Sequence, residues 1–335
     1  MKFKIQSSMF NFLLKKILPL LCICFFACGQ KPQYAENQPV VTYVSAFNSD
    51  SAYRFIQNQV NFGARVPNTE AHRKCAEYLS GELKRFGAEV VEQRADLKAY
   101  DGTILKAINI IGSFNPENKH RILLFAHWDS RHVCDYDLIP ENRTQPVMGA
   151  NDGASGVGVL LEIARQIGNE KPEIGVDIIF FDAEDYGTPA NFAGREENTW
   201  CLGSQYWSKN PHIAGYKAHF GILLDMVAAP DATFFKEYYS MYYAAHVVKK
   251  VWTAALDLGF GQYFKDNRGS AIVDDHYYVN RLANIPSINI IHTSADGGFG
   301  KYWHTTHDTM ENIDRNTIFA VGTILMYVIY NEKPF

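Results

Sequence analysis

Residues 176–185 read VDIIFFDAED, an apolar run that ends in a cluster of acids. The apolar part, Val176–Phe181, has the length and composition of a β-strand that is buried on both faces. Strands of this kind are typical of parallel sheets whose two faces are covered by helices. Similar short runs occur three more times in the chain, at Ile122–Ala126, Phe220–Leu224 and Ile285–Ile291.

The segments between the predicted strands have the periodicity of amphipathic helices. Gly153–Ile167 places its apolar residues on one helical face, and Thr69–Phe86 does the same, with Asn68 expected as the N-cap. Strands that alternate with helices predict the α/β class, here a single-domain α/β/α sandwich with a mixed, mostly parallel central sheet. Two further helices are expected at Met241–Leu258 and Ile313–Tyr330, and a β-hairpin at Val90–Leu97 and Thr103–Ile111.

The composition excludes several classes of protein. The 335 residues are 47% hydrophobic and 14% aromatic, which is too apolar for an intrinsically disordered chain. Lys and Arg total 32 against 36 Asp and Glu, and no basic block is present, so we expect no nucleic-acid partner. Six cysteines in a chain of this length do not indicate a disulfide-rich scaffold.

The first 27 residues have the pattern of a secretion signal. Lysines precede the apolar stretch Ile17–Ala27, which is too short to span a membrane as a helix but suits a signal-peptide h-region. Ala27 before Cys28 resembles a bacterial lipoprotein cleavage site and predicts a lipid on Cys28. A plain signal peptide that is cut nearby is the alternative.

The chain is therefore expected to have three parts. These are a lipoprotein signal peptide at residues 1–27, a lipidated cysteine with a flexible tether at 28–45, and a single folded domain at 46–335. We expect the protein in the periplasm of a Gram-negative bacterium, attached to the membrane through the lipid on Cys28. At most one disulfide can form among the remaining cysteines, which are Cys75, Cys134 and Cys201.

Ionisable residues follow each predicted strand, and this is where sites form in open α/β sheets. Carboxylates that gather in one cleft repel one another, and a divalent cation relieves the repulsion. A mixture of histidine and carboxylate ligands suits Zn²⁺ with an open coordination position. The residues concerned are His127, Asp129, Asp152, Glu184, Asp185, Asp225, Asp274 and His304.

These residues occur in the order seen in the zinc-dependent aminopeptidase superfamily, and the chain resembles its M28-like members. Finer motifs are similar to one branch, the glutaminyl-peptide cyclotransferases (glutaminyl cyclases) of the animal and bacterial periplasmic type. The motifs are Phe62-Gly63-Ala64-Arg65-Val66-Pro67, Leu224-Asp225-Met226, Asp274-Asp275-His276 and Trp303-His304-Thr305.

The resemblance implies a role for each residue at the site. One zinc ion per chain would be held by Asp152, Asp185 and His304, and Glu184 would be the general acid/base. Asp225 and Asp274 would form a hydrogen-bonded carboxylate pair near the reacting atoms, Trp303 would line the substrate pocket, and His127 and Asp129 would support the ligands. The substrate would be a peptide or protein with an N-terminal glutamine, which is converted to pyroglutamate with release of ammonia.

Two departures from the family pattern and two rival functions remain open. Asp185 stands where the family usually has Glu, and Ala190 stands where the animal enzymes have a Trp, so that Phe192, Trp200 or nothing takes its place. The main alternative is an aminopeptidase with two zinc ions, for which His127 and Asp225 would also be ligands. A peptide-binding lipoprotein without catalysis is the second alternative, which the intact set of ligands and Glu184 disfavours.

Overall fold

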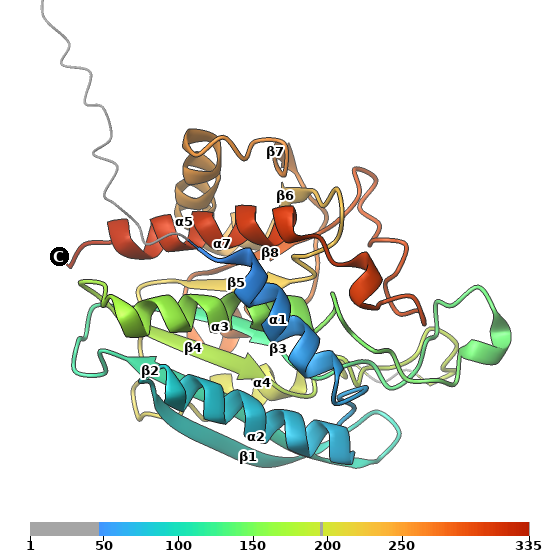
Figure 1. Cartoon of the computed structure of the whole chain (residues 1–335). Helices are drawn as coiled ribbons and strands as arrows, with labels where there is room; N and C mark the ends of the chain where they lie inside the picture. The colour runs from blue at the N-terminus through green and yellow to red at the C-terminus, as the bar shows by residue number, and fades with distance from the viewer. Residues whose placement is uncertain (1–46, 195–196, 335) are drawn as a thin grey trace, which may run out of the picture. The chain divides into compact units, whose positions relative to one another are not determined.

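The predicted strands form one six-stranded sheet in the computed structural model, which describes residues 47–194 and 197–334 (Figure 1). The strand order is β1-β2-β4-β3-β5-β8. The pairs β3–β4, β3–β5 and β5–β8 are parallel, while β1–β2 and β2–β4 are antiparallel, which confirms the mixed, mostly parallel sheet. The strands are β1 (Glu89–Lys98), β2 (Ile104–Phe114), β3 (Arg121–His127), β4 (Gly175–Phe181), β5 (Gly221–Asp225) and β8 (Ser287–Ile291).

Both faces of the central strands are buried, as their continuous apolar composition predicts. Along β3, Leu124 and Ala126 belong to one hydrophobic core, while Leu123 and Phe125 belong to a second core on the opposite face. This alternation is the two-residue period of an extended strand. Helices must therefore cover both sides of the sheet.

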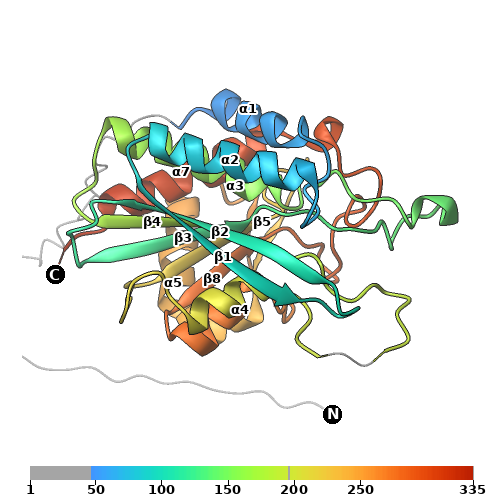
Figure 2. The same ribbon diagram turned by 90° about the horizontal axis from the view of Figure 1, so that it is seen from below.

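The helices form the two outer layers, as Figure 2 shows from below. One layer holds α1 (Ser49–Val60), α2 (Glu70–Arg85), α3 (Ala154–Asn169) and α7 (Arg315–Asn331). The other layer holds α4 (Leu202–Lys209), α6 (Asp275–Tyr278) and η2 (Val279–Ala283), while α5 (Tyr238–Asp257) packs along the edge strand β8 and against α7. The short elements are β6 (Phe234–Lys236), β7 (Phe264–Arg268), η1 (Pro140–Asn142) and η3 (Met310–Asn312).

The N-cap of α2 differs from the prediction. The side chain of Thr69 accepts a hydrogen bond from the backbone N–H of His72, so Thr69 is the N-cap. Asn68 instead has a left-handed backbone (φ 74°), and its side chain accepts from Lys106 N and donates to Ile104 O of β2. Asn68 therefore connects the start of α2 to the sheet instead of capping the helix.

Three further findings concern the ends and the cysteines. The predicted signal peptide, Cys28 and tether lie outside the described residues. In the part that is described, no helix is long and apolar enough to cross a membrane. Cys75, Cys134 and Cys201 are all buried and free, so none of them forms a disulfide.

Candidate active site

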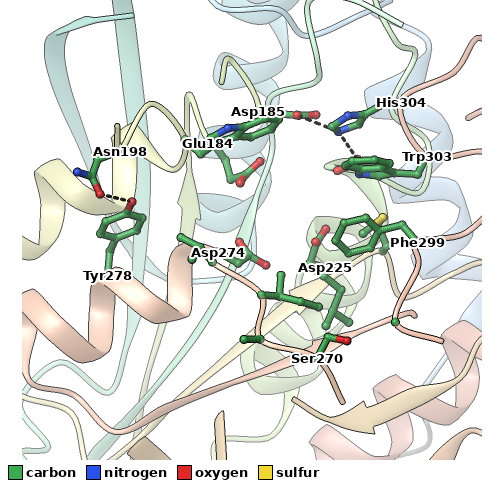
Figure 3. Close-up of a pocket in the computed structure, with 18 of the residues that line it drawn as sticks. Glu184, Asp185, Asn198, Asp225, Ser270, Asp274, Tyr278, Phe299, Trp303 and His304 are labelled. Carbon is green, nitrogen blue, oxygen red and sulfur yellow. Dashed lines mark hydrogen bonds and ion pairs between the residues drawn. The ribbon is translucent and has the colours of Figure 1, made fainter. Parts of the chain in front are cut away.

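The carboxyl ends of β4, β5 and β8 open into a pocket of about 650 Å³ (Figure 3). A cavity of this size is typical of the sites that bind small molecules. The seven residues predicted to act as ligands, acid/base groups or substrate contacts all line it, although they come from segments far apart in the chain. They are Asp152, Glu184, Asp185, Asp225, Asp274, Trp303 and His304.

Three clusters of three residues at this pocket could each hold a metal ion, with all ligand atoms of a cluster within 4.8 Å of one another. The first consists of Asp152, Asp185 and His304, the second of His127, Asp152 and Asp225, and the third of Glu184, Cys201 and Asp274. The first two share Asp152. His304 Nε2 lies 3.2 Å from Asp185 Oδ1 and 3.5 Å from Asp152 Oδ2. The first cluster is the ligand set predicted for a single zinc ion.

The donor atoms of the first cluster fit a zinc ion. Asp185 is 1% exposed, and its Oδ2 atom has no hydrogen-bond partner among the described residues. A buried carboxylate oxygen without a partner is costly, and a divalent cation would satisfy it. One imidazole nitrogen and two carboxylates also leave a coordination position for substrate, as in catalytic zinc sites.

The turn after β4 aims Glu184 and Asp185 at the same point. Ala183 has a left-handed backbone (φ 52°), which turns the chain sharply at the end of the strand. Asp129 then holds the turn, because its two carboxylate oxygens accept the backbone N–H groups of Glu184 and Asp185, each at 3.1 Å. His127 and Asp129 are buried and do not line the pocket.

Burial and crowding raise the pKa values of the acids in the pocket. The pKa of Glu184 lies well above its usual range because the group is buried and the charges of Asp185 and Asp274 lie nearby, although His127 opposes this. The pKa of Asp225 rises to about 7 for the same reasons, and burial also raises that of Asp274. A carboxyl group that titrates near neutrality can both take and return a proton.

Asp225 and Asp274 lie on the same side of the pocket, but each has other partners. The oxygens of Asp274 accept from Asp275 N and from Asn289 Nδ2, each at 2.6 Å, while Asp225 Oδ1 lies 3.3 Å from His127 Nε2. No hydrogen bond joins the two carboxylates among the described residues. Asp274 is the N-cap of α6, and its backbone hydrogen bond fixes its position, so the expected direct pair is replaced by two separately held acids.

Two buried acids that the sequence analysis did not single out hold the ligand-bearing loops. Asp308 accepts the backbone N–H groups of Asn151 and Asp152, at 2.7 and 3.0 Å. Asp135 lies 3.6 Å from His304 Nδ1. Its carboxylate accepts two hydrogen bonds from the guanidinium of Arg131, at 2.8 and 2.7 Å. Asp135 therefore orients the imidazole electrostatically, since the separation exceeds a hydrogen bond.

Aromatic side chains form the walls of the pocket. The Trp303 ring stacks on His304 at 3.7 Å and contacts Phe299 at 4.6 Å. Trp200 also lines the pocket, parallel to His304, and the Arg131 guanidinium lies over it at 4.5 Å. Of the candidates for the position left open by Ala190, Trp200 is thus the one found at the pocket.

The other aromatic candidate lies elsewhere. Phe192 does not line the pocket; its ring packs edge-on against Tyr100, 5.0 Å away. Trp207 is fully buried in the core beneath α4.

Glu237 connects the pocket-lining segment that contains Ile272 to the start of α5. Its carboxylate accepts the N–H groups of Tyr239 and Ser240 at the start of the helix and that of Ile272 in the pocket-lining segment. His276 Nε2 contacts the same carboxylate at 3.0 Å. Burial opposes the ionised form of Glu237, but these partners lower its pKa to about 2.

Comparison with known proteins places this geometry in a family. A structure described as glutaminyl cyclase of Bacteroides thetaiotaomicron bound to N-acetylhistamine is 57% identical and superposes with a TM-score of 0.86, over 87% of this chain and 100% of that one. A structure described as a Zn-dependent exopeptidase from Parabacteroides distasonis is 58% identical (TM-score 0.85) over the same shares. Glutaminyl-peptide cyclotransferase of Bos taurus is 25% identical over 295 residues, which cover 79% of this chain and 77% of that protein. The model of peptidase family M28 matches residues 109–329, and the chain belongs to this family.

Proposed function

We propose that the protein is a zinc-dependent glutaminyl-peptide cyclotransferase, an acyltransferase that converts an N-terminal glutamine to pyroglutamate. The observation that carries the proposal is the pocket itself, in which Glu184, Asp225 and Asp274 face a cluster of zinc-type donors between aromatic walls. The similarity to proteins described as glutaminyl cyclases supports the same reaction.

The residues of the pocket suit an intramolecular acyl transfer. Asp152, Asp185 and His304 would hold the zinc ion, which when bound supplies Lewis acidity to the γ-amide carbonyl. The free α-amine is the nucleophile, and it is already tethered to its target, so holding it in place lowers the barrier greatly. Asp225 and Asp274 accept hydrogen bonds from the amine and amide N–H groups and so orient them.

Glu184 moves the proton. As the bond between the α-nitrogen and the γ-carbonyl carbon forms, the Glu184 carboxylate accepts a proton from the nitrogen. As the bond to the amide nitrogen breaks, Glu184 returns that proton, and ammonia leaves. The pyroglutamyl peptide is the second product, so atoms and charges balance without a water molecule.

The aromatic walls of the pocket also protect the substrate amide from water. If water attacked the same carbonyl, the product would be glutamate. Packing of the substrate methylene groups against Trp200 and Trp303 excludes water from the amide and favours the ring closure.

The second cluster makes an aminopeptidase the second candidate function of the protein. His127, Asp152 and Asp225 could hold another metal ion, and a Zn-dependent exopeptidase is among the similar structures. We infer one zinc ion per chain, with His127 acting as an ion-pair partner of the carboxylates of Asp152 and Asp225, whose oxygens lie 3.0 and 3.3 Å from its Nε2 atom.

One experiment separates the two candidates. The purified protein is analysed for zinc and assayed on a Gln-initiated peptide, with and without a chelator, for ammonia and for free amino acids. One zinc ion per chain and chelator-sensitive ammonia release support the cyclotransferase. Two zinc ions with release of free amino acids would establish the aminopeptidase instead.

We also propose that the mature protein is a periplasmic lipoprotein attached to the membrane through Cys28. The support is the sequence pattern of residues 1–28, which ends in an alanine before the cysteine. Substitution of Cys28→Ala should move the protein from the membrane to the soluble fraction of expressing cells. Retention of the variant at the membrane would refute the lipid anchor.

A further inference from the structure

The most exposed large apolar side chain of the described residues lies near the active site. Leu138 is 92% exposed, and its neighbours Tyr136 and Ile139 are 50% and 52% exposed. These three residues, the 136–139 patch, lie in the loop that follows β3 and carries η1, beyond the carboxyl end of the sheet (Figure 1). Grouped apolar residues on a surface mark an interaction site, whereas single ones do not.

The backbone beneath the patch is firmly held. The carboxylate of Asp137 accepts hydrogen bonds from Thr306 N at 3.0 Å and Thr306 Oγ1 at 2.7 Å, and from Ile139 N at 2.9 Å. The carbonyl of Asp137 accepts from Arg143 Nε at 2.8 Å. Because these bonds order the loop, the apolar side chains are presented to solvent in a fixed arrangement.

The patch is continuous with the pocket. The Tyr136 ring lies 4.4 Å from the ring of Trp303, which lines the pocket, and Tyr136 N donates to the carbonyl of His304 at 3.2 Å. A chain that leaves the pocket past Trp303 therefore meets Tyr136 first and the side chains of Leu138 and Ile139 next.

The polypeptide substrate is the occupant that this position favours. The pocket admits the N-terminal residue, so the rest of the substrate must pass its mouth, and an extended chain advances by about 3.3 Å per residue. We propose that the 136–139 patch is a second binding surface for the substrate, which holds apolar side chains at the third and fourth positions of the chain. This inference rests on the proposed cyclotransferase activity and adds a substrate preference to it.

The test compares three substrates on the full-length protein. They are Gln-Gly, which ends at the pocket mouth, and the hexapeptides Gln-Gly-Leu-Leu-Gly-Lys and Gln-Gly-Ser-Ser-Gly-Lys. The ratio of kcat/KM for the Leu peptide to that for the Ser peptide should be about ten in the wild type, which corresponds to about 1.4 kcal/mol. That value is within what partial burial of two leucine side chains supplies.

Two variants assign the preference to the patch. The double variant Leu138→Ser/Ile139→Ser should lower the ratio to below about two, while its turnover of Gln-Gly stays unchanged and shows that it is folded. Leu256→Ser is the matched control, because Leu256 is 60% exposed on α5 and outside the pocket, and this variant should keep the ratio of the wild type.

The outcomes separate the possible explanations. A wild-type ratio near one, or a double variant that keeps a tenfold ratio, would overturn the inference. Weaker binding of the double variant to vesicles of phosphatidylethanolamine and phosphatidylglycerol, with an unchanged ratio, would assign the patch to a membrane and also overturn it. If the wild type does not turn over Gln-Gly at all, it is the proposed function that fails.

Discussion

Replacement of Glu184 by Gln should lower turnover by at least two orders of magnitude and leave the metal site intact. Glutamine has nearly the same shape as glutamate, so the volume of the pocket does not change. Its amide oxygen can still accept the contact that Cys201 Sγ makes with Glu184 Oε1 at 3.1 Å. What the amide cannot do is accept a proton from the attacking amine and return it to the leaving group.

The magnitude follows from the role of the lost group. Proton transfer by a positioned side chain contributes about 10²- to 10⁴-fold to a rate, so kcat should fall by that factor, or about 3–5 kcal/mol in activation free energy. Folding should change by no more than about 1 kcal/mol, because no cavity forms. Zinc content should stay at the wild-type level, since the cluster of Asp152, Asp185 and His304 is untouched.

The assay measures ammonia release from a Gln-initiated peptide and zinc content of the same dialysed samples. Glu197→Gln is the matched control, because Glu197 lines the same pocket but is exposed, and it should keep turnover within about threefold. A Glu184→Gln variant that retains near-normal turnover would refute Glu184 as the acid/base group. A variant that loses its zinc would show that Glu184 is a metal ligand, which also contradicts the assignment.

Four other substitutions test the framework of the fold and of the site. Asp135→Asn should weaken zinc binding by about 10- to 100-fold in competition with a chromophoric chelator, because it removes the charge that orients the histidine of the cluster; unchanged affinity would exclude this role. Gly203→Ala should lower the free energy of unfolding in urea by about 2–3 kcal/mol, since a Cβ there would lie 2.1 Å from the backbone oxygen of Asp182. Gly81→Ala, with nothing within 4 Å in the interior of α2, should instead stabilise by about 0.5–1 kcal/mol. The folded-state pKa of Glu237 is lowered from 4.5 to about 2. The ionised group therefore contributes up to about 3 kcal/mol to the free energy of unfolding above pH 4.5, and this contribution is lost as the pH falls towards 2. The difference in stability between the wild type and Glu237→Gln should shrink over that range, and a constant difference would contradict the reasoning.

The elements that decide the fold could be predicted because their signals are local. A run such as Val176–Phe181 has one plausible structure, and the acids that follow it must lie at the end of a strand. The apolar face of Gly153–Ile167 similarly predicted α3, which extends over Ala154–Asn169. The Asn68 prediction was wrong because adjacent Asn and Thr are both good caps, and the choice between them depends on how Asn68 pairs with β2.

The supporting residues could not be predicted in the same way. Asp308 bonds to backbone groups 156 and 157 positions away, and such a contact leaves no periodic trace in the sequence. Arg131 and Asp135 are four residues apart, but they lie in a loop, where this spacing carries no structural meaning. Trp200 lines the pocket from the turn before α4, where Cys201 takes a left-handed backbone (φ 57°), and no local sequence pattern predicts such a turn.

The arrangement of Asp129 affects how mutational scans of this family are interpreted. One carboxylate fixes the backbone of both Glu184 and Asp185, so the proposed proton carrier and a proposed metal ligand move together. A substitution at Asp129 should therefore reduce catalytic rate and metal affinity in parallel, without Asp129 touching substrate or metal. A parallel loss of catalytic rate and metal affinity therefore indicates that the substituted residue positions both groups. It does not by itself show that the residue contacts the substrate or the metal.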